Sequence, residues 1–239
     1  RVASSPDWPP FEYLDPVTDE FAGFEVDILE EVMRRLGEEE GVTITVDWVE
    51  MDFGSIKEAV VAKTVDLGVS GFSVTPERWE SVQYVTSHSV TEAQIIALNT
   101  TAATVGMLES VAELADYDLD CGAQSGTTQE DELIALIAAG TIPEGTLVTF
   151  TDYLAAMDDL VAGALDTVYA ETPVSYYWIS QYAEQGYEIE VIFAKPYWPV
   201  AFIAHHDSDV LVAKISGVIA ELISEGWIAD LAAEYEMVY

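Results

Sequence analysis

Two segments of the chain repeat the same local pattern at an interval of one hundred residues. Residues 61–70 read VAKTVDLGVS and residues 161–170 read VAGALDTVYA, so both place Val-Ala, an apolar residue and Asp before a strand-like run. Thr75-Pro76 follows the first segment and Thr172-Pro173 the second, a pair typical of a helix N-cap and first turn. Helices and strands that alternate in this way predict an α/β fold with two similar lobes. Coincidental reuse of a common α/β pattern is the alternative.

Helix ends can be assigned from the sequence. The segment VDILEEVMRRLG at 26–37 places its apolar residues on one face, with Gly37 as the C-terminal stop. Ser55 and Glu58 have the spacing of a capping box. A further helix is expected to begin after Thr151 as N-cap and to end at Gly163.

The chain is strongly acidic, with 44 acidic and 8 basic residues and a formal net charge of −36. Nucleic acids and anionic membrane surfaces need a basic footprint, so both are excluded as partners. Apolar residues make up 50% and aromatic residues 11%, which is enough for a core and excludes a disordered acidic chain. Because the acids are spread along the whole chain, they indicate a halophile's protein rather than an acidic tail.

Few features favour a membrane span, a metal site or an enzyme. The sequence has neither an apolar run of the length that a membrane span needs nor a recognisable signal peptide. It begins at Arg1 with a strand-like segment, so we expect that a leader has been removed. Cys121 is the single cysteine and is expected to be a small buried side chain in a strand. The histidines lack metal-ligand spacing, and GVSGFS is not a nucleophile elbow. We therefore predict no catalytic residue, metal or cofactor.

A candidate carboxylate site follows the first repeated strand. Ser70, Gly71 and Ser73 lie at its carboxyl end, where ligands of α/β sheets collect. Arg78 falls in the first turn of the helix that begins at Thr75. A guanidinium beside hydroxyls, a glycine and a helix N-terminus suits a carboxylate. The alternative is a surface arginine that pairs with one of the many acids.

The turn CGAQSGTTQED offers a second place for an anionic group. Thr127 or Thr128 is expected to begin a helix there, with free backbone N–H groups in its first turn. The turn lacks the lysine of a Walker loop, so a nucleotide phosphate is not favoured. Simple helix capping explains the two threonines equally well.

Four segments together resemble one family: DWPPFEYLDPVTDEFAGFEVDILEEVMRRLG, MDFGSIKEAVVAKTVDLGVSGFSVTPERWESVQYVTS, AQSGTTQE and ISEGWIADLAAEYE. They are similar, in order and spacing, to the polar amino-acid-binding subgroup of the type II periplasmic solute-binding proteins of ABC importers, which is extracellular solute-binding family 3. The resemblance covers nearly the whole chain. It implies a two-lobed α/β clamshell in which each lobe is a mixed β-sheet flanked by helices.

The resemblance also implies the domain boundaries. Two crossover hinge strands are expected near AQIIALN and FAKPYWPV. Lobe 1 would then comprise residues 1–96 and 197–239, and lobe 2 residues 97–196.

Ligand contacts follow from the resemblance, position by position. Arg78 would bind the α-carboxylate of an amino acid with help from the region of Ser70, Gly71 and Ser73. The second lobe would add the SGTT match, with Ser125, Thr127 and Thr128.

Three further positions complete the implied site. Glu171 would bind the α-ammonium, at a position where the family usually has Asp. Trp8 and Phe53 correspond to aromatic residues that could sandwich the ligand's side chain, although core packing is the commoner role of such residues. Glu12, beside them, is expected to point outward.

The implied function is capture of an amino acid or related zwitterionic solute by lobe closure, and its delivery to the permease of an ABC importer. Such a protein would be a monomer outside the cytoplasm, anchored to the membrane through a leader that this chain lacks, and it would not be an enzyme. One alternative is a cyclohexadienyl (prephenate or arogenate) dehydratase of the same fold, with Glu171 as proton donor. A ligand-binding sensory domain is another.

The charge of −36 predicts that salt stabilises the protein. Between about 0.1 and 2 M KCl the Debye length falls from ~10 Å to below ~3 Å, which screens the repulsion between acids. We expect the melting temperature to rise steeply over this range. Thermal unfolding followed by circular dichroism measures it, and a constant melting temperature would contradict the prediction.

Overall fold

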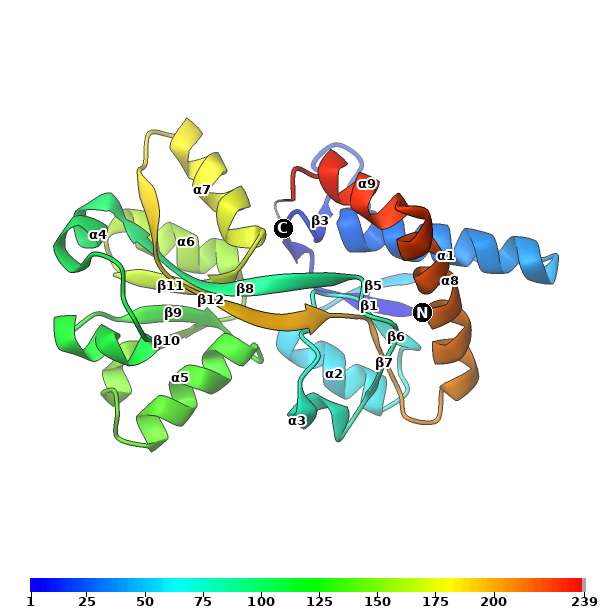
Figure 1. The fold of residues 1–239 in the computed structure, drawn as a ribbon, viewed down its shortest axis with the longest axis horizontal. Coiled ribbons are helices and arrows are strands. Elements are labelled where there is room, and N and C mark those ends of the chain that lie inside the picture. The colour runs from blue at the N-terminus through cyan, green and yellow to red at the C-terminus, as the bar shows by residue number, and fades with distance from the viewer. Residues whose placement is uncertain (238–239) are drawn as a thin grey trace. The chain divides into compact units, whose positions relative to one another are not determined.

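The computed structural model describes residues 1–237, and the chain divides into two compact units. Unit 1 comprises Arg1–Val90 and the chain from Trp198 onward, and unit 2 is Thr91–Tyr197. The chain leaves unit 1 in β8 (Ser89–Leu98) and returns in β12 (Ile189–Val200), two long strands labelled in Figure 1. The lobe boundaries predicted at 96/97 and 196/197 fall in these same two strands.

Unit 1 contains a five-stranded mixed sheet in the order β5-β1-β6-β13-β7. Its strands are Trp48–Glu50, Val2–Ser4, Leu67–Gly68, Ile203–Ala204 and Gln83–Tyr84. β1 pairs in parallel with β5 and β6, whereas β13 pairs antiparallel with β6 and β7. A small antiparallel sheet of β2 (Asp7–Trp8), β3 (Glu12–Leu14) and β4 (Phe21–Ala22) precedes the first helix.

The helices of unit 1 are α1 (Phe24–Glu40), α2 (Phe53–Val61), α3 (Pro76–Trp79), α8 (Asp209–Glu225) and α9 (Trp227–Glu234). Helix α1 packs against α8, and α2 packs against β1, β6 and β13. The helices bury apolar faces in the core, which includes Leu29, Ile56, Phe202 and Ile219. Burial of these faces is the main source of stability.

Unit 2 has its own five-stranded sheet in the order β10-β9-β11-β8-β12. β9 (Cys121–Gln124) pairs in parallel with β10 (Leu147–Phe150) and β11 (Thr167–Glu171), and β11 pairs antiparallel with β8. The helices are α4 (Asn99–Val105), α5 (Thr128–Ala138), α6 (Tyr153–Ala162) and α7 (Val174–Glu184), with short 3-10 turns at Val111–Tyr117 and Glu144–Thr146. The predicted α/β class, with a mixed sheet and helices in each lobe, is confirmed.

The predicted end of the first helix is wrong. Helix α1 continues through Gly37 to Glu40 and ends at Gly41, which has a left-handed φ of 68°. Gly37 is needed for another reason, because a Cβ there would lie 2.7 Å from the carbonyl oxygen of Val42. The glycine therefore allows the chain after the helix to return along it.

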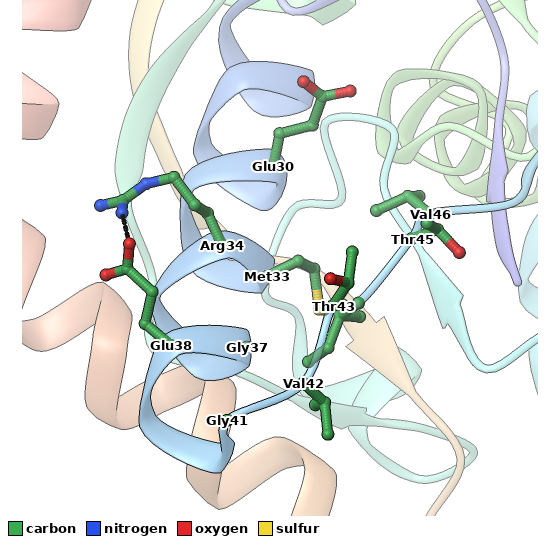
Figure 2. Close-up of a pocket in the computed structure, with 11 residues that line it drawn as sticks. Glu30, Met33, Arg34, Gly37, Glu38, Gly41, Val42, Thr43, Thr45 and Val46 are labelled. Carbon is green, nitrogen blue, oxygen red and sulfur yellow. Dashed lines mark hydrogen bonds and ion pairs between the residues drawn. The ribbon is translucent and has the colours of Figure 1, made fainter.

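This return creates a groove in unit 1 between α1 and residues 42–46, with a volume of about 800 Å³ (Figure 2). Glu30, Arg34 and Glu38 line its helical side, and an Arg34–Glu38 ion pair of 2.6 Å lies there. None of the predicted site residues lines this groove.

Two predicted caps are wrong because an aspartate takes the position. Helix α2 begins at Phe53 after Asp52, so Ser55 is already inside the first turn and forms no capping box. Helix α6 is capped by Asp152, whose carboxylate accepts a hydrogen bond from the N–H of Ala155 at 2.8 Å, rather than by Thr151. The C-terminal stop at Gly163 is confirmed, with φ of 70°.

The two Thr-Pro pairs differ in role. Thr75 caps α3 as predicted, and its hydroxyl accepts from the N–H of Arg78 at 3.2 Å. In the second pair the peptide bond is cis and α7 begins one residue later, at Val174. The Thr172 hydroxyl instead accepts from the N–H of Glu92 at 2.9 Å. Thr172 is therefore not the predicted N-cap.

Cys121 lies in β9 and is buried as predicted, and burial raises the pKa of its thiol to about 12. Within residues 1–237, helices of membrane-spanning length and apolarity are absent. The same residues contain no cluster of His, Cys, Asp and Glu side chains that could hold a metal ion.

Substitution by alanine should have opposite effects on the free energy of unfolding at two glycines of unit 1. A Cβ at Gly68 in β6 would lie 2.7 Å from Ile56 Cγ2 and 2.8 Å from Ile203 Cγ1, so Gly68→Ala should lower the free energy of unfolding by about 1–3 kcal/mol. At Gly217 in α8 a Cβ meets open space, so Gly217→Ala should raise it by roughly 0.5–1 kcal/mol. Urea unfolding in molar KCl measures both, and a stabilised Gly68→Ala would contradict this packing.

Candidate functional site

Six of the predicted site residues belong to unit 1 and four to unit 2. Those of unit 1 gather around the loop that joins β6 to α3: Trp8, Phe53, Ser70, Gly71, Ser73 and Arg78. Those of unit 2 lie at the start of α5 and at the end of β11: Ser125, Thr127, Thr128 and Glu171.

Arg78 is buried, with 8% of its surface exposed. Its guanidinium carbon lies 5.6 Å from the ring centroid of Phe53 and 5.5 Å from that of Phe72. The two rings stack on each other at 4.8 Å and 25°. Nη1 of Arg78 also donates to the Ser73 carbonyl oxygen at 3.3 Å. Cation–π contact and a carbonyl therefore hold the guanidinium in the interior of unit 1 and not on its surface.

Arg78 also contributes to the packing of unit 1. Its side chain covers two aromatic rings, so truncation would expose apolar surface as well as remove a charge. Phe53 is 9% exposed and belongs to the hydrophobic core of unit 1. Its ring also contacts the guanidinium of Arg78.

The loop residues before Arg78 are held by the protein itself. The Ser70 hydroxyl donates to Glu12 Oε1 at 3.0 Å and accepts from the N–H of Ser5 at 3.1 Å. Gly71 has φ of 58°, and its N–H donates to Glu25 Oε2 at 2.8 Å. These contacts show that Ser70 and Gly71 fix the shape of the loop.

Trp8 and Ser73 complete the surroundings of this loop. A Cβ at Gly71 would lie 3.1 Å from the indole Nε1 of Trp8, so a glycine is needed for the ring to approach the backbone so closely. Ser73 is buried, and its carbonyl oxygen accepts from the Tyr84 hydroxyl at 3.0 Å as well as from Arg78. The structure thus brings all six predicted residues of unit 1 to one loop and its packing partners.

A buried acid cluster supports the loop, and the sequence analysis missed it. Glu12 is fully buried, so the expectation that it points outward is wrong. Glu25, also fully buried, accepts from Gly71 through one oxygen and lies 2.7 Å from His88 Nε2 through the other. Burial, and then repulsion by Glu25, raise the pKa of Glu12 well above its usual value. Glu25 shares the buried face of α1 with Ile28, a helical spacing that could have revealed it.

In unit 2, the turn before α5 is largely satisfied internally. Thr127 is the N-cap, accepting from the N–H of Glu130 at 3.2 Å and donating to the Gln124 carbonyl at 2.6 Å. The N–H of Gly126 donates to the Glu130 carboxylate at 2.7 Å, and that of Ser125 donates to the Phe150 carbonyl at 2.8 Å. Helix capping therefore accounts for Thr127.

Glu171 ends β11 and is 4% exposed. Its Oε1 accepts from Gln129 Nε2 at 2.7 Å, and its Oε2 accepts from the Thr91 hydroxyl at 2.6 Å. The side-chain amide oxygen of Gln129, Oε1, accepts in turn from the Thr128 hydroxyl at 3.3 Å. The sequence analysis missed Gln129 and Thr91; the position of Gln129 in the first turn after the double threonine was the available signal.

The raised pKa of Glu12 predicts a pH dependence of stability. The folded protein holds a proton on Glu12 that the unfolded chain releases above about pH 4.3, so this contribution is complete below that pH and is lost as pH rises through the folded-state pKa. Glu12→Gln keeps the shape without titrating. We expect its free energy of unfolding, relative to the parent, to increase with pH.

Urea unfolding over about pH 4–8 in molar KCl measures this difference. Glu50→Gln, at an exposed position in the edge strand β5, is the matched control. A pH-independent difference between Glu12→Gln and the parent would show that Glu12 does not take up a proton on folding.

Comparison with known proteins agrees with this architecture. A family model described as "Bacterial extracellular solute-binding proteins, family 3" matches residues 1–237. The ABC transporter arginine-binding protein 1 of Escherichia coli (strain K12) is 24% identical over 221 residues, which cover 92% of this chain and 83% of that protein.

Solved structures share the fold. An ancestral arginine-binding protein bound to arginine matches with a TM-score of 0.85 and 19% identity, covering 98% of this chain and 96% of the other. The ancestral amino acid-binding protein AncCDT-1, a precursor of cyclohexadienyl dehydratase, matches with a TM-score of 0.80 and 21% identity, covering 98% and 94%.

These matches confirm the predicted type II binding-protein fold and support a location outside the cytoplasm. The family model spans both units, including the loop of Arg78 and the strand of Glu171. The chain belongs to the bacterial extracellular solute-binding proteins of family 3.

Proposed function

We propose that this protein binds a free amino acid outside the cytoplasm and delivers it to the permease of an ABC importer. The observation that carries the proposal is the buried guanidinium of Arg78, which lies within about 6 Å of the ring centroids of Phe53 and Phe72. A planar guanidinium can donate two parallel hydrogen bonds to a carboxylate, which every free amino acid supplies. Its desolvated setting makes such a pair stronger than one on the surface.

Unit 2 supplies the opposite charge. We assign the α-ammonium of the ligand to Glu171, and we propose that Ser125, Thr127 and Thr128, at the start of α5, assist Arg78 in binding the α-carboxylate. Thr91 and Gln129 each donate a hydrogen bond to one oxygen of Glu171, which fixes the orientation of the group. A carboxylate held in this way suits a cationic group.

We propose L-arginine, or another cationic amino acid, as the first ligand to test. Three relatives named for arginine binding support this choice, and one of them aligns over most of the chain. Trp8 and Phe53 are aromatic surfaces on which a ligand guanidinium could stack.

The carboxylate and the ammonium are assigned to different units, so one ligand would link them. We propose that capture involves a rearrangement of the two units, as in other hinged binding proteins. A monomeric state and a membrane anchor remain predictions of the family resemblance.

A dehydratase is the second candidate, because AncCDT-1 shares the fold and Glu171 replaces the family's usual Asp. A dehydratase would need an acid that gives up a proton. In the structure both oxygens of Glu171 accept hydrogen bonds, from Thr91 and from Gln129, and neither donates in these contacts. Incubation with prephenate or arogenate tests this candidate. Formation of an aromatic product would favour the dehydratase over the binding protein.

The proposal predicts that Arg78 is required for amino-acid affinity. Arg78→Lys keeps the charge but loses the planar fork, and Arg78→Ala loses both, so binding should weaken by about 2–5 kcal/mol. Isothermal titration of L-arginine and of a panel of other amino acids, in molar KCl, measures the change.

Arg34→Lys, a matched substitution of an exposed arginine on α1, should leave affinity unchanged. Melting curves of each Arg78 variant show whether the lost packing over Phe53 and Phe72 has destabilised the fold. A weaker affinity in a variant that is still folded can then be assigned to the lost ligand contact. Binding of no amino acid by the parent would overturn the proposed function, whereas full affinity in Arg78→Lys would move the carboxylate site elsewhere.

A further inference from the structure

Two buried neutral side chains orient the carboxylate of Glu171. Gln129 is 1% exposed and donates to Oε1 at 2.7 Å, and Thr91 is 5% exposed and donates to Oε2 at 2.6 Å. They come from different elements, the first turn of α5 and the strand β8. Each oxygen of the carboxylate is therefore fixed separately, which sets the rotation of the group as well as its position.

Both donors are themselves constrained. Thr91 lies two residues before Ala93, which is the register partner of Glu171 in the antiparallel pair of β8 and β11. Residues two apart share a face of the sheet, so the Thr91 hydroxyl and the Glu171 side chain project from the same side. The branched Thr side chain has few rotamers in a strand, so its hydroxyl is well placed.

The amide of Gln129 is oriented by a second contact. Its carbonyl oxygen accepts from the Thr128 hydroxyl at 3.3 Å, so its NH₂ group faces Glu171. Thr128 thus acts on Glu171 through Gln129. The chain of contacts Thr128–Gln129–Glu171–Thr91 lies wholly within unit 2.

We propose that Gln129 and Thr91 are positioning residues that prepare Glu171 to bind the ligand's ammonium, an inference that rests on the proposed function. Both donors are uncharged, so they orient the carboxylate and add no positive charge of their own. An arginine or lysine in their place would satisfy the carboxylate and compete with the ligand for its charge. The arrangement selects ligands that carry a cationic α-nitrogen, and it disfavours the corresponding hydroxy or keto acids.

The test compares two ligands on matched variants. Thr91→Val is nearly isosteric but has no hydroxyl, and Gln129→Met has similar length but no donor. Each should weaken L-arginine binding by about tenfold or more, because a bond to a charged group is lost. Binding of 5-guanidinopentanoate, which is arginine without the α-ammonium, should be weaker than that of arginine in the parent and should change by less than about twofold in the variants.

Controls separate positioning from structural support. Thr91→Ser keeps the hydroxyl and should restore affinity for arginine. Thr167→Val removes a buried hydroxyl of the same sheet that donates to the Asp120 carbonyl, so it should alter the melting temperature but not the affinity. Because Gln129 and Thr91 lie on different elements, one variant still tests the proposal if the other fails to fold.

Isothermal titration in molar KCl gives each result. Equal loss for both ligands in Thr91→Val and Gln129→Met would mean that the two residues only support the fold. Unchanged arginine affinity in both variants would overturn the inference while leaving amino-acid binding by the parent intact. Equal affinity of the parent for the two ligands would remove Glu171 as the ammonium site, and absence of arginine binding in the parent would count against the proposed function.

Discussion

Burial of charge is the constraint on which both halves of the candidate site depend. A charged side chain removed from water must be compensated by neighbouring groups, and the two charged side chains of the candidate site have such neighbours. Arg78 rests on Phe53 and Phe72, whereas Glu171 accepts from Thr91 and Gln129. Groups held in this way need little reorganisation when a ligand arrives, which favours tight binding.

Charged groups on the surface are compensated by exposed ion pairs and by solvent. Among residues 1–237, basic side chains that form ion pairs with acids include Arg1, Arg34, Arg35, Lys57, Lys63, Lys195 and Lys214. Most of these pairs are exposed and so contribute little each. With 44 acids in the chain, the majority must be compensated by water and dissolved cations. Aromatic rings also contact basic groups: Lys195 lies over Phe193 and Tyr197, and Arg78 lies over Phe53 and Phe72.

The sequence predicted the α/β class and the placement of Arg78 and Glu171 at strand and helix ends, because these depend on local periodicity and capping signals. It did not predict the end of α1, since Gly37 is required by contact with Val42 and not by helix termination. It also missed Glu12 and Glu25, because burial of an acid depends on residues distant in sequence. Gln129 and Thr91 were missed for the same reason: they meet at Glu171 only through the pairing of β8 with β11 and the position of α5.

The contacts described above for Arg78 lie in unit 1 and those described for Glu171 lie in unit 2, which would have an evolutionary consequence for the proposed site. If the proposed assignment holds, a mutation of Phe53 or Phe72 leaves the hydrogen bonds from Thr91 and Gln129 to Glu171 in place. A lineage with this architecture can change what its receptors accept in small separable steps, with one end of an ancestral ligand still recognised while the other diverges.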